Sequence, residues 1–163
     1  MCGFVGLNKK DKILNDEISK ISNISLNLKH RGPNQTGEWV SDNIFFSHRR
    51  LSINDLSEEG KQPMTSSSGR YIIIYNGEIY NFLELKKNLQ ESGIKFKSKS
   101  DTEVILSLIE EEGFLNSLKK LNGMFSFALY DKKLKKIFLA RDHTGQKPLY
   151  FFKNNDTFFF TSE

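Results

Sequence analysis

The sequence predicts an α+β domain in which helices and antiparallel strands form separate layers. Helical periodicity is found in three separate segments between residues 13 and 113, within the first two-thirds of the chain. Strand-like segments rich in β-branched and aromatic residues lie before, between and after these helices. A chain of 163 residues, 37% of them hydrophobic, suits one domain spanning 1–163 with a core that needs no disulfide.

The N-terminal segments are predicted to be a strand, a helix and a second strand. Residues 3–8 are apolar and bounded by glycine, which is typical of a buried strand. Apolar residues then recur at helical spacing between residues 13 and 28, and Gly32 and Pro33 end that helix. The next strand is expected at 43–53, where an apolar run ends in polar residues.

A third strand is predicted at 70–79 by its β-branched and aromatic residues. Asn76-Gly77 lies within it and is a pair suited to positive φ, so we expect the strand to break there. The sequence after this pair runs into a capped helix rather than a returning strand, which argues against a plain hairpin turn.

Two helices follow, each beginning with a capping box and ending at a glycine. The boxes start at Asn81 and Ser100, and the terminal glycines are Gly93 and Gly113. Asp101 therefore falls in the first turn of the second helix. Backbone N–H groups and the helix dipole favour an ionised carboxylate at that position.

The last third of the chain is predicted to form four strands. The segments are 124–131, 136–142, 148–152 and 157–162, and each is rich in aromatic or aliphatic residues. The turn-like sequences KKLK and KNND join the members of each pair. We therefore expect two hairpins of an antiparallel sheet.

Composition and cysteine usage favour a soluble, cytoplasmic protein. Cys2 is the only cysteine, so no intrachain disulfide can form, as is usual in a reducing compartment. The N-terminus lacks a signal-peptide pattern, and no segment approaches the roughly 20 apolar residues of a membrane span. The net charge of +4 comes from scattered lysines rather than a basic stripe, which argues against nucleic-acid binding. The chain ends directly after an aromatic strand, and we expect a longer natural protein.

The position of Cys2 directly after Met1 has two interpretations. As a small hydrophobic residue, it would simply start the buried strand. If Met1 is removed, Cys2 instead becomes the first residue and carries both a thiol and a free α-amine. This amine has a reference pKa of about 7.7–8, so part of it is neutral near pH 7 and able to accept the thiol proton. The three histidines each adjoin an arginine or aspartate, which indicates structural hydrogen bonds rather than a catalytic base.

A thiol nucleophile also needs oxyanion donors and substrate anchors. Asn76 and Gly77 offer a side-chain amide and a backbone N–H, which are a suitable donor pair. Arg50 is one of five arginines beside 19 lysines, and its planar guanidinium could grip a carboxylate at two points. Asp101 could pair with an ammonium group. A carboxylate grip and an ammonium grip together would fit the α-amino-acid end of a substrate.

Eight segments, taken in order along the chain, form a recognisable set. They are MCGFVG, HRGPNQTGEW, HRRLSINDL, GKQPM, YNGEIYNF, SDTEVIL, LNGMFSFALYD and RDHTGQKPLYFF. This set resembles the glutaminase domain of glutamine-hydrolysing asparagine synthetases, which are class II glutamine amidotransferases. The resemblance covers the chain from residue 2 to residue 163. It implies the N-terminal nucleophile hydrolase fold, an αββα sandwich of two antiparallel sheets between helical layers.

The resemblance also implies a role for each candidate residue. Cys2 would attack the side-chain amide of glutamine, form a γ-glutamyl thioester and release ammonia. Asn76 and Gly77 would form the oxyanion hole. The residues implied to bind glutamine are Arg50 at the α-carboxylate, Glu78 and Asp101 at the α-amine, and Asn76 together with Leu51, Ser52, Ile53 and Asn54 along the pocket.

A following synthetase domain is implied as the partner that uses the ammonia. The chain contains neither a Ser-Gly-Gly-x-Asp-Ser pyrophosphate loop nor a Walker-type loop. ATP and Mg²⁺ are therefore expected only for that further domain, where an acceptor carboxylate, by default aspartate, would be amidated. No metal or organic cofactor is expected for residues 1–163.

Two alternative functions stay open. The domain could be an N-terminal nucleophile amidase for another amide, but a substrate without an α-amino-acid end would not need both Arg50 and Asp101. It could also be a non-catalytic module that senses glutamine or docks to a partner. Retained Met1 would favour that alternative, because it would block the α-amine. Lys99 stands where some members of the family have glycine, which bears on how closely the backbone approaches glutamine.

Overall fold

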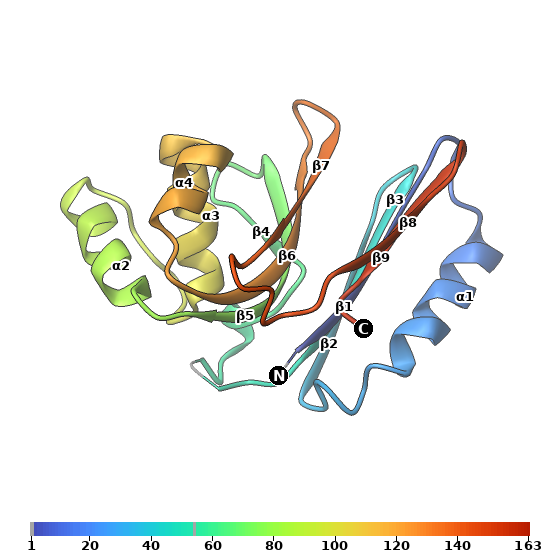
Figure 1. Cartoon of the computed structure of the whole chain (residues 1–163), viewed down its shortest axis with the longest axis horizontal. Coiled ribbons are helices and arrows are strands. Elements are labelled where there is room, and N and C mark those ends of the chain that lie inside the picture. The colour runs from blue at the N-terminus through green and yellow to red at the C-terminus, as the bar shows by residue number, and fades with distance from the viewer. Residues whose placement is uncertain (1, 54) are drawn as a thin grey trace.

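The computed structural model describes residues 2–53 and 55–163, which form two antiparallel sheets and their covering helices (Figure 1). The first sheet has the strand order β2-β3-β1-β9-β8, with β1 at Gly3–Lys9, β2 at Gln35–Val40, β3 at Ile44–Arg50, β8 at Tyr150–Lys153 and β9 at Thr157–Thr161. The second has the order β4-β5-β6-β7, with β4 at Met64–Thr65, β5 at Tyr71–Ile79, β6 at Gly123–Asp131 and β7 at Lys136–Arg141. The helices are α1 at Asn15–Leu26, α2 at Phe82–Glu91, α3 at Asp101–Glu112 and α4 at Phe114–Lys120, with a short 3₁₀ helix at Glu58–Gly60.

These elements stack as four layers. The two sheets face each other, α1 covers the outer face of the first sheet, and α2, α3 and α4 cover the outer face of the second (Figure 1). The sheets converge toward the end of the sandwich that holds the N-terminus. Both the α+β class and the αββα arrangement are thus confirmed.

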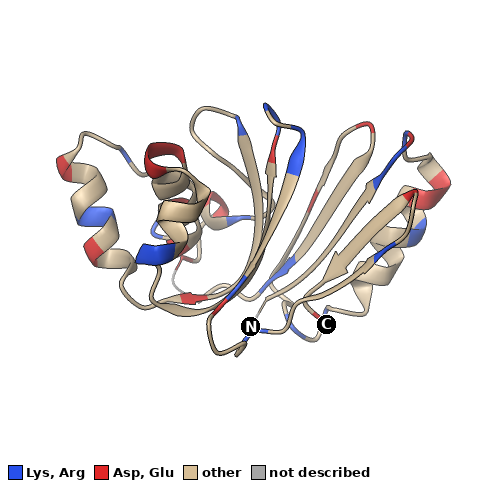
Figure 2. Cartoon of the chain, turned by 45° about the horizontal axis from the view of Figure 1, so that its top comes forward, with Lys and Arg blue, Asp and Glu red and all other residues tan. Residues whose placement is uncertain are grey.

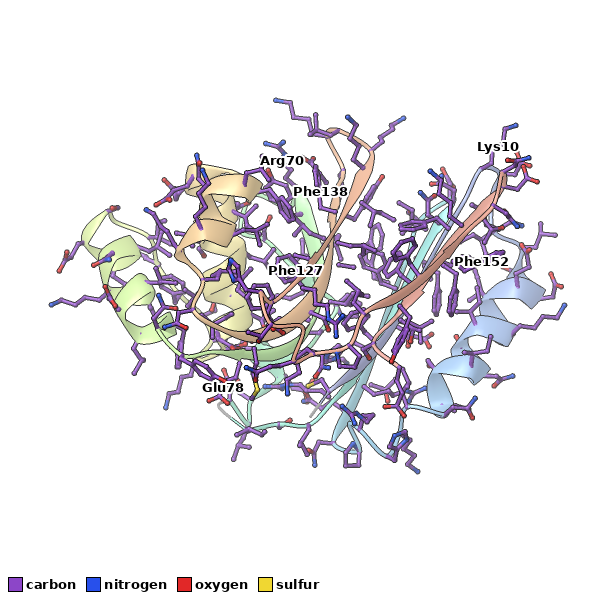
Figure 3. All side chains as sticks on the ribbon, in the orientation of Figure 1. Lys10, Arg70, Glu78, Phe127, Phe138 and Phe152 are labelled. Carbon is purple, nitrogen blue, oxygen red and sulfur yellow. The ribbon has the colours of Figure 1, made fainter. Side chains whose placement is uncertain are left out.

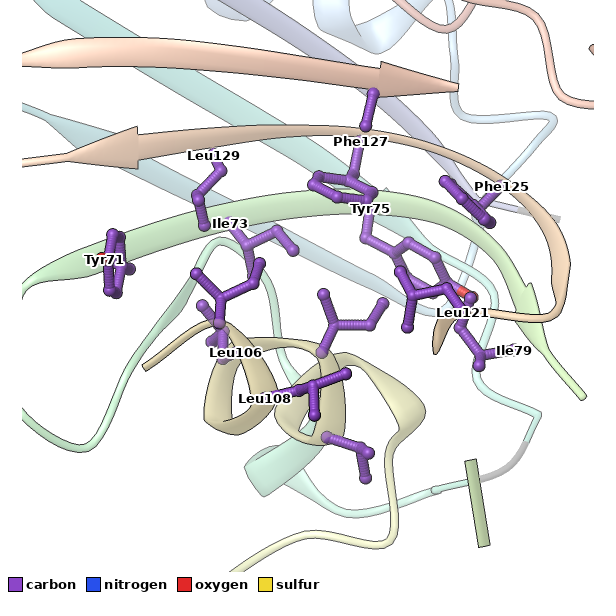
Figure 4. Packing of buried hydrophobic residues seen from close by; sticks show 14 of the residues in the cluster. Tyr71, Ile73, Tyr75, Ile79, Leu106, Leu108, Leu121, Phe125, Phe127 and Leu129 are labelled. Atoms are coloured by element: carbon purple, nitrogen blue, oxygen red, sulfur yellow. The ribbon is translucent and has the colours of Figure 1, made fainter. Parts of the chain in front are cut away.

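Three apolar clusters fill the spaces between the layers. Strand β5 contributes to two of them, because its successive side chains point to opposite faces. Ile72 and Ile74 pack between the sheets, whereas Tyr71, Ile73 and Tyr75 pack against the helices (Figure 4). Burial of both faces explains the continuous apolar run of this strand. The third cluster lies between the first sheet and α1.

Strand β5 does not break at Asn76-Gly77, so that expectation is wrong. Both residues pair with β6, and Asn76 lies opposite Ser126. Gly77 is needed for close approach rather than for a turn, since a Cβ there would lie 2.3 Å from the carbonyl oxygen of Met124. Pairing along the full strand overrides the local turn preference of the dipeptide.

Of the two expected capping boxes, neither forms completely. Ser100 caps α3, and its Oγ accepts a hydrogen bond from the N–H of Thr102 at 3.1 Å. Asn81 precedes α2 but makes no capping bond, and its Oδ1 instead accepts from the N–H of Asn122 at 3.0 Å. Asp101 begins α3, as expected.

Four short elements were not predicted, and the last four strands are arranged differently from expectation. The unpredicted elements are β2, β4, α4 and the 3₁₀ helix at Glu58–Gly60. The hairpins β6–β7 and β8–β9 both form, but they belong to different sheets. The local pattern identifies a hairpin, whereas the choice of sheet depends on contacts with distant strands.

Phe160→Ala is expected to lower the free energy of unfolding by about 3–5 kcal/mol. The ring is fully buried between the sheets, lies edge-to-face against Phe46 with ring centres 5.7 Å apart, and covers Gly6. Urea denaturation followed by circular dichroism measures the change. Phe151→Ala on β8 is the matched control, because that side chain is 68% exposed and its loss should change stability by no more than about 0.5 kcal/mol. Equal losses in the two variants would contradict the described core.

Charged residues of both signs are interspersed along the helices and near strand ends (Figure 2). The exposed aromatic residues of β8, including Phe152, lie at the edge of the first sheet (Figure 3). Within residues 2–53 and 55–163, no helix is both long and apolar enough to cross a bilayer.

Candidate active site

A pocket of about 90 Å³ opens beside Cys2, which immediately precedes β1. This volume is small beside the roughly 300–1,000 Å³ of drug-sized ligand pockets, which indicates a small ligand. The pocket lies at the end of the sandwich that holds the N-terminus, where Glu78 is also found (Figures 1 and 3). The other candidate residues that line it are Arg50, Leu51, Ile53, Gly77, Glu78 and Asp101.

The remaining candidates do not line this pocket or cannot be placed. Ser52 is absent from the described lining, and its N–H donates to Asn34 Oδ1 at 3.0 Å. Asn76 is completely buried beside the lining residue Gly77. Asn54 lies outside the described residues.

The Cys2 thiol contacts the backbone of Leu51, the first residue after β3. Its Sγ lies 3.4 Å from the N–H nitrogen of Leu51 and 3.8 Å from the carbonyl oxygen of the same residue. Burial raises the pKa of the Cys2 thiol, while the Leu51 N–H and the charge of Arg50 act in the opposite direction. A thiol in this setting needs a nearby base to become an effective nucleophile.

Arg50 is buried at the end of β3 and is partly held by neighbouring backbone. Its Nη1 donates to Gln35 Oε1 at 2.5 Å and to the carbonyl oxygen of Ser57 at 2.9 Å, and its Nη2 donates to the carbonyl oxygen of Asp55. A guanidinium has five N–H donors, and the described residues accept from three of those of Arg50, which leaves two for a ligand. The described residues place no carboxylate in an ion pair with Arg50. Its positive charge is therefore available to a carboxylate that enters the pocket.

Asp101 provides the opposite charge from the N-terminal end of α3. Its Oδ2 accepts hydrogen bonds from the Tyr75 hydroxyl at 2.7 Å and from the Ile79 N–H at 3.1 Å. Burial raises the pKa of Asp101, and these two donors counteract that effect. With Asp55 and Glu78 also on the lining, the pocket has one cationic and three anionic side chains.

The Asn76 amide is the most unusual polar group near the pocket. Both its Nδ2 and its Oδ1 are buried without a hydrogen-bond partner among the described residues. Ser126 Oγ, on the residue directly opposite in β6, is also unpartnered. Buried polar groups are normally paired, so an unpaired amide beside a pocket indicates a donor reserved for a ligand or an intermediate.

The histidines do not contribute to the described pocket lining. His48 is fully buried and its Nε2 lies 2.9 Å from the carbonyl oxygen of Tyr75. Burial lowers the pKa of His48 to about 4, so its ring is neutral at pH 7. His30 contacts Glu163, which also pairs with Arg31 at 3.3 Å. The expected structural roles of His30 and His48 are confirmed.

Asp55, Gln62 and Tyr75 are among the lining residues that the sequence analysis did not single out. Gln62 Oε1 accepts from the Tyr75 N–H at 2.7 Å, and the Tyr75 hydroxyl in turn reaches Asp101. These three residues belong to three of the eight recognised segments, but no local pattern marks them as functional. Within the described residues, no group of three or more His, Cys, Asp and Glu side chains is arranged to hold a metal.

Comparisons with known proteins extend over the whole chain. Residues 1–163 match the family described as "Glutamine amidotransferase domain". The chain is 40% identical over 168 aligned residues to glutamine-hydrolysing asparagine synthetase 1 of Bacillus subtilis (strain 168), covering all of this chain and 26% of that protein. It is 41% identical over 133 residues to glutamine-hydrolysing asparagine synthetase B of Escherichia coli (strain K12), covering 80% of this chain and 23% of that protein. The chain thus spans about a quarter of the length of these curated relatives.

A solved structure shares the fold. Glutamine phosphoribosylpyrophosphate amidotransferase from B. subtilis, complexed with ADP and GMP, superposes with a TM-score of 0.80 at 24% sequence identity. The match covers 99% of this chain and 42% of that one. With a family match from the first residue to the last and relatives about 40% identical, the chain belongs to the glutamine amidotransferase domain family.

Proposed function

We propose that this domain hydrolyses the side-chain amide of glutamine to glutamate and ammonia. The observation that carries the proposal is the shared pocket of Cys2, Arg50 and Asp101. A buried guanidinium and a buried carboxylate complement the carboxylate and ammonium of a free α-amino acid. Glu78 adds a second negative charge for the ammonium. A substrate held by this end would present its side chain to the thiol.

The first half of the reaction uses two groups of one residue. After removal of Met1, the free α-amine of Cys2 accepts the thiol proton, and the sulfur attacks the side-chain amide carbon of glutamine. The resulting oxyanion is stabilised by the Asn76 amide and the Gly77 N–H. The protonated amine then donates its proton to the departing nitrogen, which leaves as ammonia. The product on the enzyme is a γ-glutamyl thioester.

Water completes the cycle. The α-amine, neutral again, accepts a proton from the water that attacks the thioester carbon. The carbon–sulfur bond breaks, the sulfur regains a proton, and glutamate leaves. None of these steps requires a metal or an organic cofactor. We therefore propose that this domain uses neither.

In the whole protein, the ammonia would supply an ATP-dependent amidation. The relatives named above are glutamine-hydrolysing asparagine synthetases, and this chain spans about a quarter of their length. We propose that a following synthetase domain uses ATP and Mg²⁺ to activate an acceptor carboxylate, with aspartate as the first candidate. We also propose a cytoplasmic location.

Mass spectrometry of the purified chain tests the proposed function. The intact mass should correspond to a chain that begins at Cys2, and a diazoketone analogue of glutamine should add once, at that cysteine. Excess glutamine should protect the thiol, whereas acetamide should not. A mass that retains Met1, or labelling that glutamine does not slow, would contradict the proposal. Equal rates with glutamine, asparagine and simple amides would instead favour an amidase of another specificity.

A further inference from the structure

We propose that Asp55 is a positioning residue that links the two charged anchors of the pocket, Arg50 and Asp101. The inference rests on the proposed function, because it concerns how the same pocket recognises glutamine. Asp55 is 6% exposed and lies in the loop between β3 and the 3₁₀ helix. Its hydrogen bonds reach both sides of the pocket.

On the first side, Asp55 organises the turn that holds Arg50. Its Oδ1 accepts from the N–H of Ser57 at 2.8 Å and from the Ser57 hydroxyl at 2.6 Å. This turn directs two backbone carbonyl oxygens, those of Asp55 and Ser57, at the guanidinium. The position of the Arg50 side chain therefore depends on the conformation that the Asp55 carboxylate stabilises.

On the second side, Asp55 reaches the segment that leads into α3. Its Oδ2 accepts from the N–H of Lys99 at 2.7 Å. Lys99 is two residues before Asp101, and Ser100 between them is the N-cap of α3. One carboxylate thus joins the turn behind the cationic anchor to the backbone that carries the anionic anchor.

Only an ionised carboxylate fits this arrangement. Burial acts to raise the pKa of Asp55, but the donors from Ser57 and Lys99 and the charge of Arg50 outweigh it and hold that pKa below its ordinary value. Each carboxylate oxygen accepts from a backbone N–H, one of Ser57 and one of Lys99. An asparagine at this position would turn its NH₂ group toward one of these two donors and lose that bond.

A pair of variants tests the link from its two ends. Asp55→Asn replaces the shared acceptor, and Lys99→Pro deletes the N–H that donates to Oδ2. In both, the KM for glutamine is expected to rise about tenfold or more, because a hydrogen bond to a buried charged group is lost. The kcat should change much less. Lys99→Ala is the matched control, since it removes the side chain and keeps the N–H, and its KM should stay within about twofold of the unsubstituted chain.

Alkylation of Cys2 by iodoacetamide separates positioning from general damage, because this reagent has no α-amino-acid end. Its rate should be the same in all four proteins, while labelling by the diazoketone analogue of glutamine should slow in Asp55→Asn and Lys99→Pro. Thermal unfolding shows whether each variant is folded. If either Asp55→Asn or Lys99→Pro is not folded, the kinetics of the other variant test the inference. The inference is overturned if KM is unchanged, or if both labelling rates fall together. If the unsubstituted chain does not hydrolyse glutamine at all, the proposed function fails instead.

Discussion

Replacing Cys2 by alanine is expected to lower glutamine hydrolysis by at least about 10³-fold and to leave the fold intact. The chain has no second thiol, and the described pocket lining contains no histidine that could activate another nucleophile. The Sγ atom contacts the Leu51 backbone at 3.4 and 3.8 Å and is only partly buried. Its removal should therefore lower stability far less than the loss of a core side chain. Ammonia release measures the activity, and thermal unfolding measures the stability.

Cys2→Ser provides the control for this experiment. It keeps a hydroxyl at the same position and the same free α-amine, but an alcohol forms its anion far less readily than a thiol does. Its activity should lie between those of the unsubstituted chain and Cys2→Ala. Substantial hydrolysis by Cys2→Ala would show that another group is the nucleophile.

Asn76→Ala is expected to lower kcat by about 10²–10³-fold, with KM changed only a few-fold. In the proposed reaction its amide donates to the oxyanion, which is absent from bound glutamine. Nδ2 and Oδ1 have no partner in the described part of the chain, so truncation breaks no internal hydrogen bond. Stability should consequently fall little or rise, in contrast to the usual loss at a fully buried site. Steady-state kinetics and urea denaturation measure the two effects.

Ser126→Ala is the matched control for Asn76→Ala. Ser126 lies directly opposite on β6, is equally buried, and also carries an unpartnered polar atom. Its loss removes no proposed donor to the oxyanion, and activity should remain within about twofold. An equal loss of activity in both variants would assign the effect to the packing of this strand pair rather than to the amide.

Local sequence patterns predicted those features of the fold that depend on residues close together in the chain. The buried run of β5, the Ser100 cap of α3 and the two final hairpins follow from neighbouring residues. The short strand β2 was missed because half-polar sequence of this kind becomes a strand only when it pairs with β3. The turn preference of Asn76-Gly77 failed for the same reason, since β6 pairs with every residue of that stretch.

The candidate site was predicted in part because some of its residues have a chemistry that stands out in the sequence. A lone cysteine at position 2 and an arginine in a lysine-rich chain are conspicuous, and the structure places Cys2 and Arg50 on one pocket. Asp55, Gln62 and Tyr75 were not predicted, because their importance lies in hydrogen bonds across 13 to 44 positions of the chain. Such hydrogen bonds form only when the fold brings these distant segments together.

The pairing of β1 with β9 bears on when the enzyme matures. β1 lies between β3 and β9, so the strand next to Cys2 gains its second neighbour only after residues 157–161 have been synthesised. Ribosomes add about 5–20 residues per second, which leaves the nascent N-terminus without that neighbour for on the order of 10 s. We expect an aminopeptidase to trim methionine during this interval, on an open chain. Trimming at this stage would act on an N-terminus whose sheet is not yet complete.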